Sequence, residues 1–397
     1  MNNKIVSLFI LFTITLNTIC YGYISLPIWD ETTYTNSEAN FLNLESESAI
    51  LIEAKTGKIL YEKNPNIPLR PASVTKIMSI LLIMEAIENN EITLETKISC
   101  SENASSMGGS QIWLSETENL TVHEMLKAIC IASANDCTYA MAEFLCGSEE
   151  VFVQKMNDKA KELGMKNTVF KNCHGLDEDG HVSSSYDIAL MSKELLTNYP
   201  EITEYTTTWM DSLRDGKSEL VNTNKLIRTY EGATGLKTGS TSLALYNLSA
   251  SATRNDLSLI AVVMRAPTPK IRFNEAKLLL DYGFNTYIYK TLNNKNDFYQ
   301  TVNISKGNKN DVNLIYEESS GILLKKSNKD NISQNVIINQ NKLVAPIYKG
   351  DVLGKIEYLI NGNIECSVNL IADDDVSRKS ATSTFSYIFS KWYNFLR

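Results

Sequence analysis

The run from Ser73 to Ile87 constrains the fold of this chain more than any other segment. Its apolar residues fall on every side of a helix: Ile77, Met78, Ile80, Leu81, Leu82, Ile83, Met84, Ala86 and Ile87. A helix with no polar face has to be covered all round by other elements. The segment therefore predicts a buried central helix, and a chain of 397 residues that is 43% hydrophobic has enough apolar material to enclose it.

The elements around this helix predict an α/β domain over residues 46–292. Hydrophobic periodicity predicts short strands at residues 49–53, 58–62, 243–250 and 257–265, and helices at residues 73–87, 122–145, 150–163, 184–196 and 271–282. Lys55-Thr56-Gly57 joins the first two strands as a hairpin turn. The order of strands, helix cluster, strands and final helix predicts a mixed sheet that carries an inserted all-helical portion.

A second, smaller domain is predicted over residues 293–372, followed by a linker over residues 373–383. Asn- and Lys-rich turns here separate short β-like runs at residues 298–304, 312–317, 321–326, 335–338, 343–347, 352–360 and 364–371. Asn361-Gly362-Asn363 lies between the last two runs. Asn-Gly favours the turn whose twist matches that of paired strands, so a hairpin is expected there. This alternation of polar turns and short β-like runs predicts an all-β domain.

The N-terminus has the pattern of an export signal. Lys4 precedes an apolar run over residues 5–16, which is too short for the ~20 residues that span a bilayer. Residues 1–22 are predicted to be a signal peptide and residues 23–45 a linker. A lipoprotein reading centred on Cys20 is disfavoured because Ile19 is bulky where a small residue is needed. The protein is therefore expected to be exported.

The C-terminal segment, residues 384–397, is predicted to be an amphipathic helix. Its apolar residues lie on one helical face: Phe385, Ile388, Phe389, Trp392, Tyr393 and Leu396. A helix docked on the protein's own core is one interpretation. An interfacial membrane anchor is favoured, because the segment is terminal, rich in aromatic residues and preceded by a polar tether. The expected location is the outer face of the cytoplasmic membrane.

Charge and cysteine content exclude several classes of function. The net charge of −8 gives no basic footprint, so no nucleic-acid partner is expected. Six cysteines remain after Cys20, and buried thiols are favoured over disulfides because a domain of this size has a core of its own. His123-Glu124 nearly begins a zinc motif, but Lys127 stands where the second histidine would be. No metal or other cofactor is predicted.

Ser73-Val74-Thr75-Lys76 is the only Ser-x-x-Lys in the chain. One helical turn brings the serine hydroxyl and the lysine amine to the same face. A serine needs a base to become a nucleophile, and burial lowers the pKa of a lysine so that its neutral amine can be that base. The motif predicts a nucleophile and base pair, although a match of two residues is weak by itself.

Two further motifs follow along the chain. Ser133-Ala134-Asn135 lies in helical surroundings and offers a second hydroxyl for proton relay and an amide for a substrate carbonyl. Lys237-Thr238-Gly239-Ser240-Thr241 precedes the strand predicted near residue 243 and supplies a cation, hydroxyls and a glycine for close backbone approach. These groups suit a peptide that ends in a carboxylate. Lys55-Thr56-Gly57 has the same letters but is explained by its turn.

In this order and spacing, the three motifs resemble the set found in penicillin-binding proteins and serine β-lactamases. More narrowly, the chain resembles the low-molecular-mass penicillin-binding proteins that are serine-type D-alanyl-D-alanine carboxypeptidases. Other segments that look like this family are Pro71-Ala72, Met107-Gly108-Gly109-Ser110, His174-Gly175-Leu176 and Leu280-Asp281-Tyr282-Gly283-Phe284. The resemblance implies a β-lactamase/transpeptidase-like domain, a small β domain and an amphipathic C-terminal anchor.

The resemblance also implies a role for each motif residue. Ser73 would be the acylated nucleophile, Lys76 its base and Ser133 a catalytic hydroxyl. The implied substrate-binding residues are Asn135, Lys237, Thr238, Gly239, Ser240 and Thr241, with the backbone N–H groups of Ser73 and Ser240 as the oxyanion hole. The implied substrate is a peptidoglycan stem peptide that ends in D-Ala-D-Ala, and β-lactam antibiotics would be covalent inhibitors.

Two alternatives stay open at this point. A serine β-lactamase would need a glutamate that activates the deacylating water, and residues 162–167 match that requirement poorly. A catalytically silent wall-binding protein of the same fold would not need the intact motif residues. Release of D-alanine from a stem-peptide mimic separates these readings.

Overall fold

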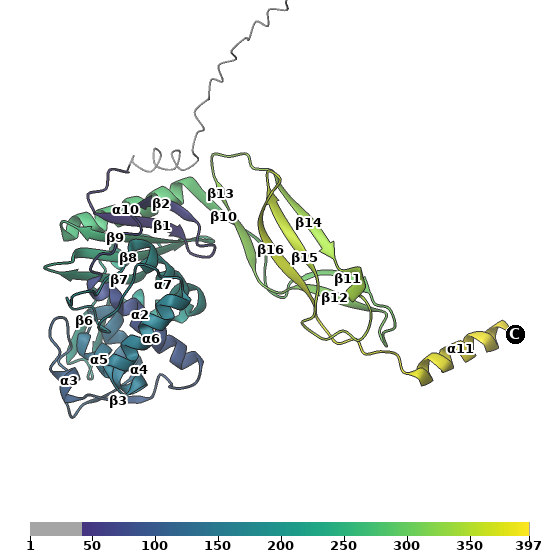
Figure 1. Ribbon diagram of the computed structural model, residues 1–397, viewed down its shortest axis with the longest axis horizontal. Helices are drawn as coiled ribbons and strands as arrows, with labels where there is room; N and C mark the ends of the chain where they lie inside the picture. The colour runs from purple at the N-terminus through teal and green to yellow at the C-terminus, as the bar shows by residue number, and fades with distance from the viewer. Residues whose placement is uncertain (1–41, 397) are drawn as a thin grey trace, which may run out of the picture. The chain divides into compact units, whose positions relative to one another are not determined.

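The computed structural model describes residues 42–396 (Figure 1). The predicted signal peptide, residues 1–22, and residues 23–41 of the predicted linker lie outside the described residues. The first part of the described chain is built on a five-stranded sheet of order β2-β1-β9-β8-β7. Its strands are β1 (Ser48–Glu53), β2 (Ile59–Lys63), β7 (Ala233–Thr241), β8 (Leu245–Arg254) and β9 (Leu257–Ala266).

The strand directions correct one detail of the sequence prediction. Every pairing in this sheet is antiparallel, so the sheet is not mixed, although the domain has the expected α/β class. The reason is that three of the four pairings join strands that are consecutive around short turns, which reverse the chain. The predicted hairpin at Lys55-Thr56-Gly57 is present, with Gly57 at a φ of +75°.

A helical cluster is inserted between β2 and β7, as the sequence predicts. Its helices are η2 (Ala72–Thr75), α2 (Lys76–Glu88), α3 (Glu102–Ser105), α4 (Val122–Lys127), η3 (Ala128–Ala132), α5 (Asn135–Cys146), α6 (Glu149–Glu162), α7 (Ser185–Asn198), η4 (Pro200–Ile202), α8 (Thr203–Thr206) and α9 (Leu226–Thr229). Two small two-stranded sheets accompany them, β3 (Lys97–Ser99) with β4 (Asn119–Thr121) and β5 (Met210–Leu213) with β6 (Ser218–Val221).

The core lies between the sheet and this cluster. All residues of α2 from Lys76 to Met84 are buried, which confirms the predicted central helix. The cluster covers one face of the sheet, and α10 (Pro269–Thr286) covers the other (Figure 1). Alternate residues of β1 serve the two faces: Ile50 and Ile52 belong to the core with the cluster, whereas Leu51 lies toward Gly283 of α10.

The helix predicted over residues 122–145 is interrupted, which is a correction. α4 runs into the π-helical turn η3, Ser133 takes a left-handed conformation with a φ of +64°, and α5 starts at Asn135. The apolar periodicity continues across the break, so the pattern conceals it. π-helical turns often occur at functional sites, and this one places the Ser-x-Asn motif at a helix junction.

Lys237 and the residues after it form the second half of β7, an edge strand of the sheet. The sequence prediction placed these residues before the strand predicted at residues 243–250, so β7 was not predicted as a strand. Gly235, Gly239 and the surrounding Thr and Ser residues give this strand little of the apolar alternation that identifies strands.

The second part is β-rich, as predicted. One sheet has the order β11-β12-β16-β15-β14, and β10 pairs with β13. The strands are β10 (Tyr287–Asn293), β11 (Phe298–Asn303), β12 (Asp311–Tyr316), β13 (Ser320–Lys325), β14 (Ile332–Ile338), β15 (Val352–Ile360) and β16 (Asn363–Ala372). Asn361 and Gly362 form the predicted hairpin loop, both with positive φ. Residues 343–347, predicted as a strand, follow the turn η5 (Gln340–Lys342) and make only isolated bridges.

The last helix is α11 (Ala381–Phe395). Phe385, Phe389, Trp392 and Leu396 are each more than half exposed. Within residues 42–396, no helix is both long enough and apolar enough to cross a membrane. The six cysteines in this range, Cys100, Cys130, Cys137, Cys146, Cys173 and Cys366, are all free thiols.

Candidate active site

The candidate nucleophile lies in a backbone constriction. Ser73 is in the 3-10 turn η2 immediately before α2, and its side chain is half-buried. Gly175 approaches this turn so closely that an added Cβ would lie 2.0 Å from the Ala72 carbonyl oxygen. On β7, a Cβ at Gly239 would lie 3.0 Å from the Ser73 backbone nitrogen. Two glycines therefore let a loop and a strand close around the serine.

Lys76, the first residue of α2, directs its amine at this serine. Its Nζ lies 3.1 Å from Ser73 Oγ, 2.5 Å from Asn135 Oδ1 and 2.7 Å from the His174 carbonyl oxygen. Burial and the neighbouring charge of Lys237 hold the pKa of Lys76 well below its usual value. A neutral amine has two N–H donors and one lone pair. The two carbonyl-type oxygens accept the two N–H groups, which leaves the lone pair for the serine hydroxyl.

Ser133 and Lys237 form a second pair from different elements. The helix junction carries Ser133, the edge strand carries Lys237, and Lys237 Nζ donates to Ser133 Oγ at 2.8 Å. Lys237 Nζ also donates to the Thr238 carbonyl oxygen at 3.0 Å. Burial lowers the pKa of Lys237 to about 7. This pair can therefore exchange a proton or bind an anion near neutral pH.

Asn135 links Lys76 to a neighbouring loop. While its Oδ1 accepts from Lys76, its Nδ2 donates to the Gly108 carbonyl oxygen at 2.7 Å. The backbone N–H of Asn135 donates to the Ser110 carbonyl oxygen at 2.7 Å. The Met107–Ser110 segment singled out in the sequence is thus held against the site.

The remaining residues of the β7 motif differ in exposure. Thr238 is buried and its Oγ1 donates to Thr223 Oγ1 at 2.7 Å, whereas Ser240 is exposed. Thr241 is half-buried, and its Oγ1 accepts the Ala244 N–H at 2.9 Å. The structure thus joins Ser73 and Asn135 to Lys76 by hydrogen bonds, and Ser133 to Lys237 by another. The two lysines are close enough for the charge of Lys237 to lower the pKa of Lys76, and Gly239 lies against the serine backbone.

Sequence reasoning missed one supporting residue, Arg272, and one supporting backbone group, the carbonyl of His174. Arg272 of α10 is buried behind β7, and its Nη1 lies 3.4 Å from the Gly239 carbonyl oxygen and 3.2 Å from that of Asn247. Burial lowers the pKa of Arg272 to about 10. Its helical position, on the same face as Ala276 and Leu279, is the signal that could have found it. The sequence singles out His174-Gly175-Leu176 as a segment, but nothing in it indicates that the His174 backbone carbonyl group contacts Lys76.

Comparison with known proteins decides the family. Residues 32–268 match the family model described as D-alanyl-D-alanine carboxypeptidase, and residues 287–378 match the C-terminal domain of penicillin-binding protein 5. The D-alanyl-D-alanine carboxypeptidase DacF of Bacillus subtilis is 46% identical over 354 residues, which are 88% of this chain and 91% of that protein.

The chain belongs to the D-alanyl-D-alanine carboxypeptidase family.

Solved structures of penicillin-binding proteins have the same fold as this chain. Penicillin-binding protein 5 from Haemophilus influenzae is 30% identical with a TM-score of 0.71, covering 84% of this chain and 98% of that one. Penicillin-binding protein D2 from Listeria monocytogenes, in its ampicillin-bound form, is 31% identical with a TM-score of 0.56, covering 61% of this chain and 98% of that one. The resemblance seen in the sequence motifs is therefore confirmed at the level of family and fold.

Proposed function

We propose that the protein is a serine-type carboxypeptidase that removes the terminal D-alanine from peptidoglycan stem peptides ending in D-Ala-D-Ala. The observation that carries this proposal is the buried Lys76 amine, which has two carbonyl acceptors and the Ser73 hydroxyl as its neighbours. Such an amine is a base aimed at a single hydroxyl. The names of the relatives supply the substrate class.

In the acylation step, Lys76 takes the proton of the Ser73 hydroxyl while Ser73 Oγ bonds to the penultimate carbonyl carbon. The tetrahedral oxyanion would be bound by the backbone N–H groups of Ser73 and Ser240, which flank the close contact at Gly239. The carbon–nitrogen bond then breaks and D-alanine leaves with a proton on its amine. The Lys237–Ser133 pair is suited to deliver that proton.

Hydrolysis completes the cycle. Water adds to the acyl carbon, a base of the same set accepts its proton, and Ser73 Oγ leaves with a proton returned to it. Lys237 would bind the terminal carboxylate of the substrate through a charge-assisted hydrogen bond, together with Thr238 and Thr241 on the same strand. β-Lactams would acylate the same serine, which agrees with the ampicillin-bound neighbour.

The β-lactamase alternative receives no support from the glutamate weighed in the sequence. Glu162 is exposed at the end of α6 and accepts from Lys159 Nζ at 3.0 Å. It does not contact any of the motif residues through the hydrogen bonds found in residues 42–396. A deacylating glutamate would have to reach a water beside Ser73.

The test is D-alanine release together with covalent labelling. The intact protein should release D-alanine from a pentapeptide mimic and be labelled by a fluorescent penicillin, and Ser73→Ala should abolish both while its circular dichroism is unchanged. Labelling of a folded Ser73→Ala protein would move the nucleophile elsewhere. Labelling of the intact protein without D-alanine release would favour the silent wall-binding alternative, and fast penicillin turnover would favour a β-lactamase.

We also propose that the enzyme works outside the cytoplasm, at the outer face of the cytoplasmic membrane. The exposed aromatic side chains of α11 support an interfacial anchor. The substrate class supports the same location, because the stem peptides of the cell wall lie outside this membrane.

A further inference from the structure

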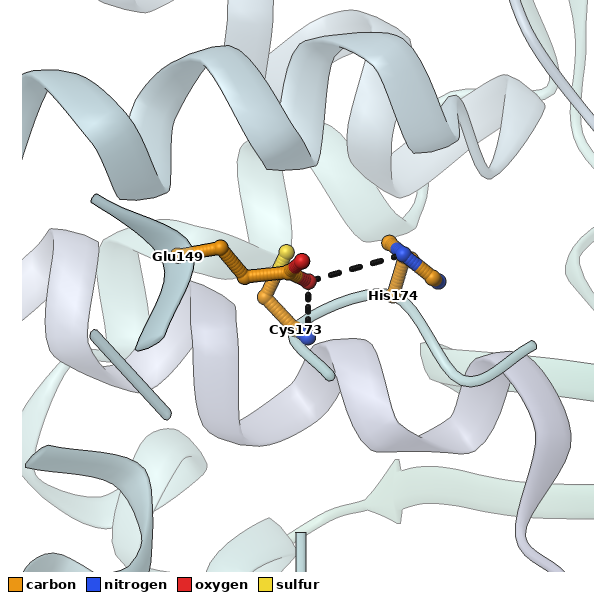
Figure 2. Close-up of side chains that lie close together, drawn as sticks. All are labelled: Glu149, Cys173 and His174. Atoms are coloured by element: carbon orange, nitrogen blue, oxygen red, sulfur yellow. Dashed lines mark hydrogen bonds and ion pairs between the residues drawn. The ribbon is translucent and has the colours of Figure 1, made fainter. Parts of the chain in front are cut away.

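Glu149, Cys173 and His174 form a cluster of side chains (Figure 2). Glu149 is the first residue of α6, and Cys173 and His174 lie in the loop that closes on η2. The Glu149 Oε1 atom accepts the backbone N–H of Cys173 at 2.9 Å and lies 3.5 Å from His174 Nε2. One carboxylate oxygen therefore contacts both the backbone and the ring of this loop.

The hydrogen bonds fix where the proton of the His174 ring lies. The Leu176 backbone N–H donates to His174 Nδ1 at 3.2 Å, so Nδ1 is an acceptor. Burial, together with the charge of Lys76, lowers the pKa of His174 to about 3, so the ring is neutral at physiological pH. A neutral ring with an acceptor at Nδ1 carries its proton on Nε2. The nitrogen that carries this proton lies 3.5 Å from Glu149 Oε1.

The same proton speaks against a metal site, although Glu149, Cys173 and His174 each offer a ligand atom within 4.8 Å of the others. A cation would have to displace the Nε2 proton while Nδ1 still faces an N–H donor. It would also need a thiolate, whereas burial and the neighbouring carboxylate hold the pKa of Cys173 well above its usual value. The cluster is built from donors that converge on one carboxylate.

We propose that Glu149 is a positioning residue for Lys76, which it serves by holding the His174 carbonyl group toward the lysine amine. This inference rests on the proposed function, because it concerns the base of that reaction. The chain of contacts is short: Glu149 holds Cys173 and His174, and the His174 carbonyl oxygen accepts from Lys76 Nζ at 2.7 Å. Glu149 itself touches neither Ser73 nor Lys76 through these contacts.

The His174 carbonyl matters because the Lys76 amine needs both of its acceptors. If one acceptor moves away, the amine can turn about its last bond and its lone pair is no longer held toward Ser73 Oγ. A misplacement of about 1 Å at a reacting group can cost about 10²-fold in rate. Glu149 therefore has an effect on the chemical step that its distance from the serine would not suggest.

The test measures acylation of Ser73 by a fluorescent penicillin in the full chain, with the rate at saturation (k2) separated from the apparent binding constant. Glu149→Asp keeps the charge but withdraws the carboxylate by about one 1.5 Å bond length. Glu149→Gln loses the charge but keeps an oxygen within reach. We expect Glu149→Asp and Glu149→Ala to lower k2 by about 10- to 100-fold with little change in binding. Glu149→Gln should stay within about threefold of the unmodified protein.

Glu150→Ala is the matched control. Glu150 lies in the same helical turn but is exposed and bonds to Ser148 rather than to the loop, so its loss should leave k2 unchanged. Labelling stoichiometry after long exposure reports the folded fraction, so misfolding does not imitate a slow k2.

The inference is overturned if Glu149→Asp acylates as fast as the unmodified protein, or if Glu149→Gln is as slow as Glu149→Ala. The second result would mean that the negative charge of Glu149, rather than the position of its side-chain oxygen, determines k2. Absence of any Ser73 labelling in the unmodified protein would instead overturn the proposed function, so the two failures are distinguishable.

Discussion

Lys237 and Lys76 are two buried lysines in one site, and burial lowers the pKa of each. Their surroundings differ in a way that suits two roles. Lys76 has carbonyl acceptors that can accept N–H groups from a neutral amine. Lys237 donates to a hydroxyl and has a pKa of about 7, so a modest electrostatic change alters its charge.

Carboxylate binding should therefore be coupled to proton uptake. A bound carboxylate favours the charged form of Lys237 and raises its pKa above about 7. Below that pH, the lysine is already protonated and no proton is taken up. Above it, close to one proton should enter the protein for each carboxylate bound. Calorimetry of a D-Ala-D-Ala peptide binding to Ser73→Ala, repeated in buffers of different ionisation enthalpy, measures this number.

We expect the number of protons taken up per bound peptide to grow between pH 7 and pH 9, because the pKa of Lys237 in the free protein is about 7. A Lys237→Ala background should abolish the uptake. Binding without proton uptake at pH 8 to 9 would mean that Lys237 is already charged in the free protein and that burial does not lower its pKa as described.

Residue spacing predicted the contact between Ser73 and Lys76, because one helical turn fixes the distance between their side chains. It could not predict the acceptors of the amine. Asn135 comes from a helix junction that periodicity conceals, and His174 contributes only its backbone carbonyl group. Contacts made by the backbone are invisible in a sequence, since every residue carries the same group.

At the scale of elements, the edge strand β7 reaches Ser73, the proposed nucleophile, only because residue 239 has no side chain. A Cβ there would lie 2.7 Å from the Pro71 carbonyl oxygen, 2.9 Å from the Val74 nitrogen and 3.0 Å from the Ser73 nitrogen. All three are backbone atoms, so no flexible side chain can move aside.

Gly239→Ala should therefore push β7 away from η2 and open the proposed oxyanion hole. We expect acylation by penicillin to slow by about 10- to 100-fold, with a lower melting temperature. Gly108→Ala is the matched control, because nothing lies within 4 Å of a Cβ at that position of the neighbouring loop. Equal acylation rates for the two variants would show that β7 does not form the oxyanion hole with Ser73.

The elements that the sequence missed share a physical cause. β7 contains the proposed substrate-binding residues, which are polar or glycine, so its apolar alternation is weak. The break at Ser133 leaves the surrounding apolar residues in helical register, so it is equally hidden. By contrast, α2 and the Asn361-Gly362 hairpin were predicted correctly, because burial on all sides and positive φ each demand particular residue types.

At the scale of the whole molecule, the order of elements predicted the α/β domain with its helical insertion and the β-rich part that follows. The boundary between these two parts can be located only from the strand pairing in the folded protein. β10 pairs with β13 of the second part, and the second family model starts at residue 287. We propose that the domain boundary lies between Thr286 and Tyr287 rather than at residue 293.

The role of α11 is also a question about the whole molecule. We predict that the signal-cleaved protein floats with anionic lipid vesicles and that moderate salt releases little of it, because apolar insertion supplies most of the affinity. A chain that lacks residues 384–397 should lose flotation while keeping its activity on short peptides. Phe389→Ser with Trp392→Ser should also weaken flotation.

Phe298→Ser is the control for that experiment, since Phe298 is an equally exposed aromatic residue on β11. If the truncated protein misfolds or loses its activity, α11 is a core helix and not an anchor.

The six free thiols have a consequence for how the chain reaches its native state. In the folded protein they are poor nucleophiles, because burial raises the pKa of Cys100 to about 11 and that of Cys130 to about 12. The unfolded chain has no such protection, and six thiols allow many wrong pairings in an oxidising compartment. If the chain folds after export, as we propose, folding competes with thiol oxidation until the core has formed and buried the cysteines. The refolding yield should therefore rise steeply with the concentration of reductant, whereas the activity of the native protein should not depend on it.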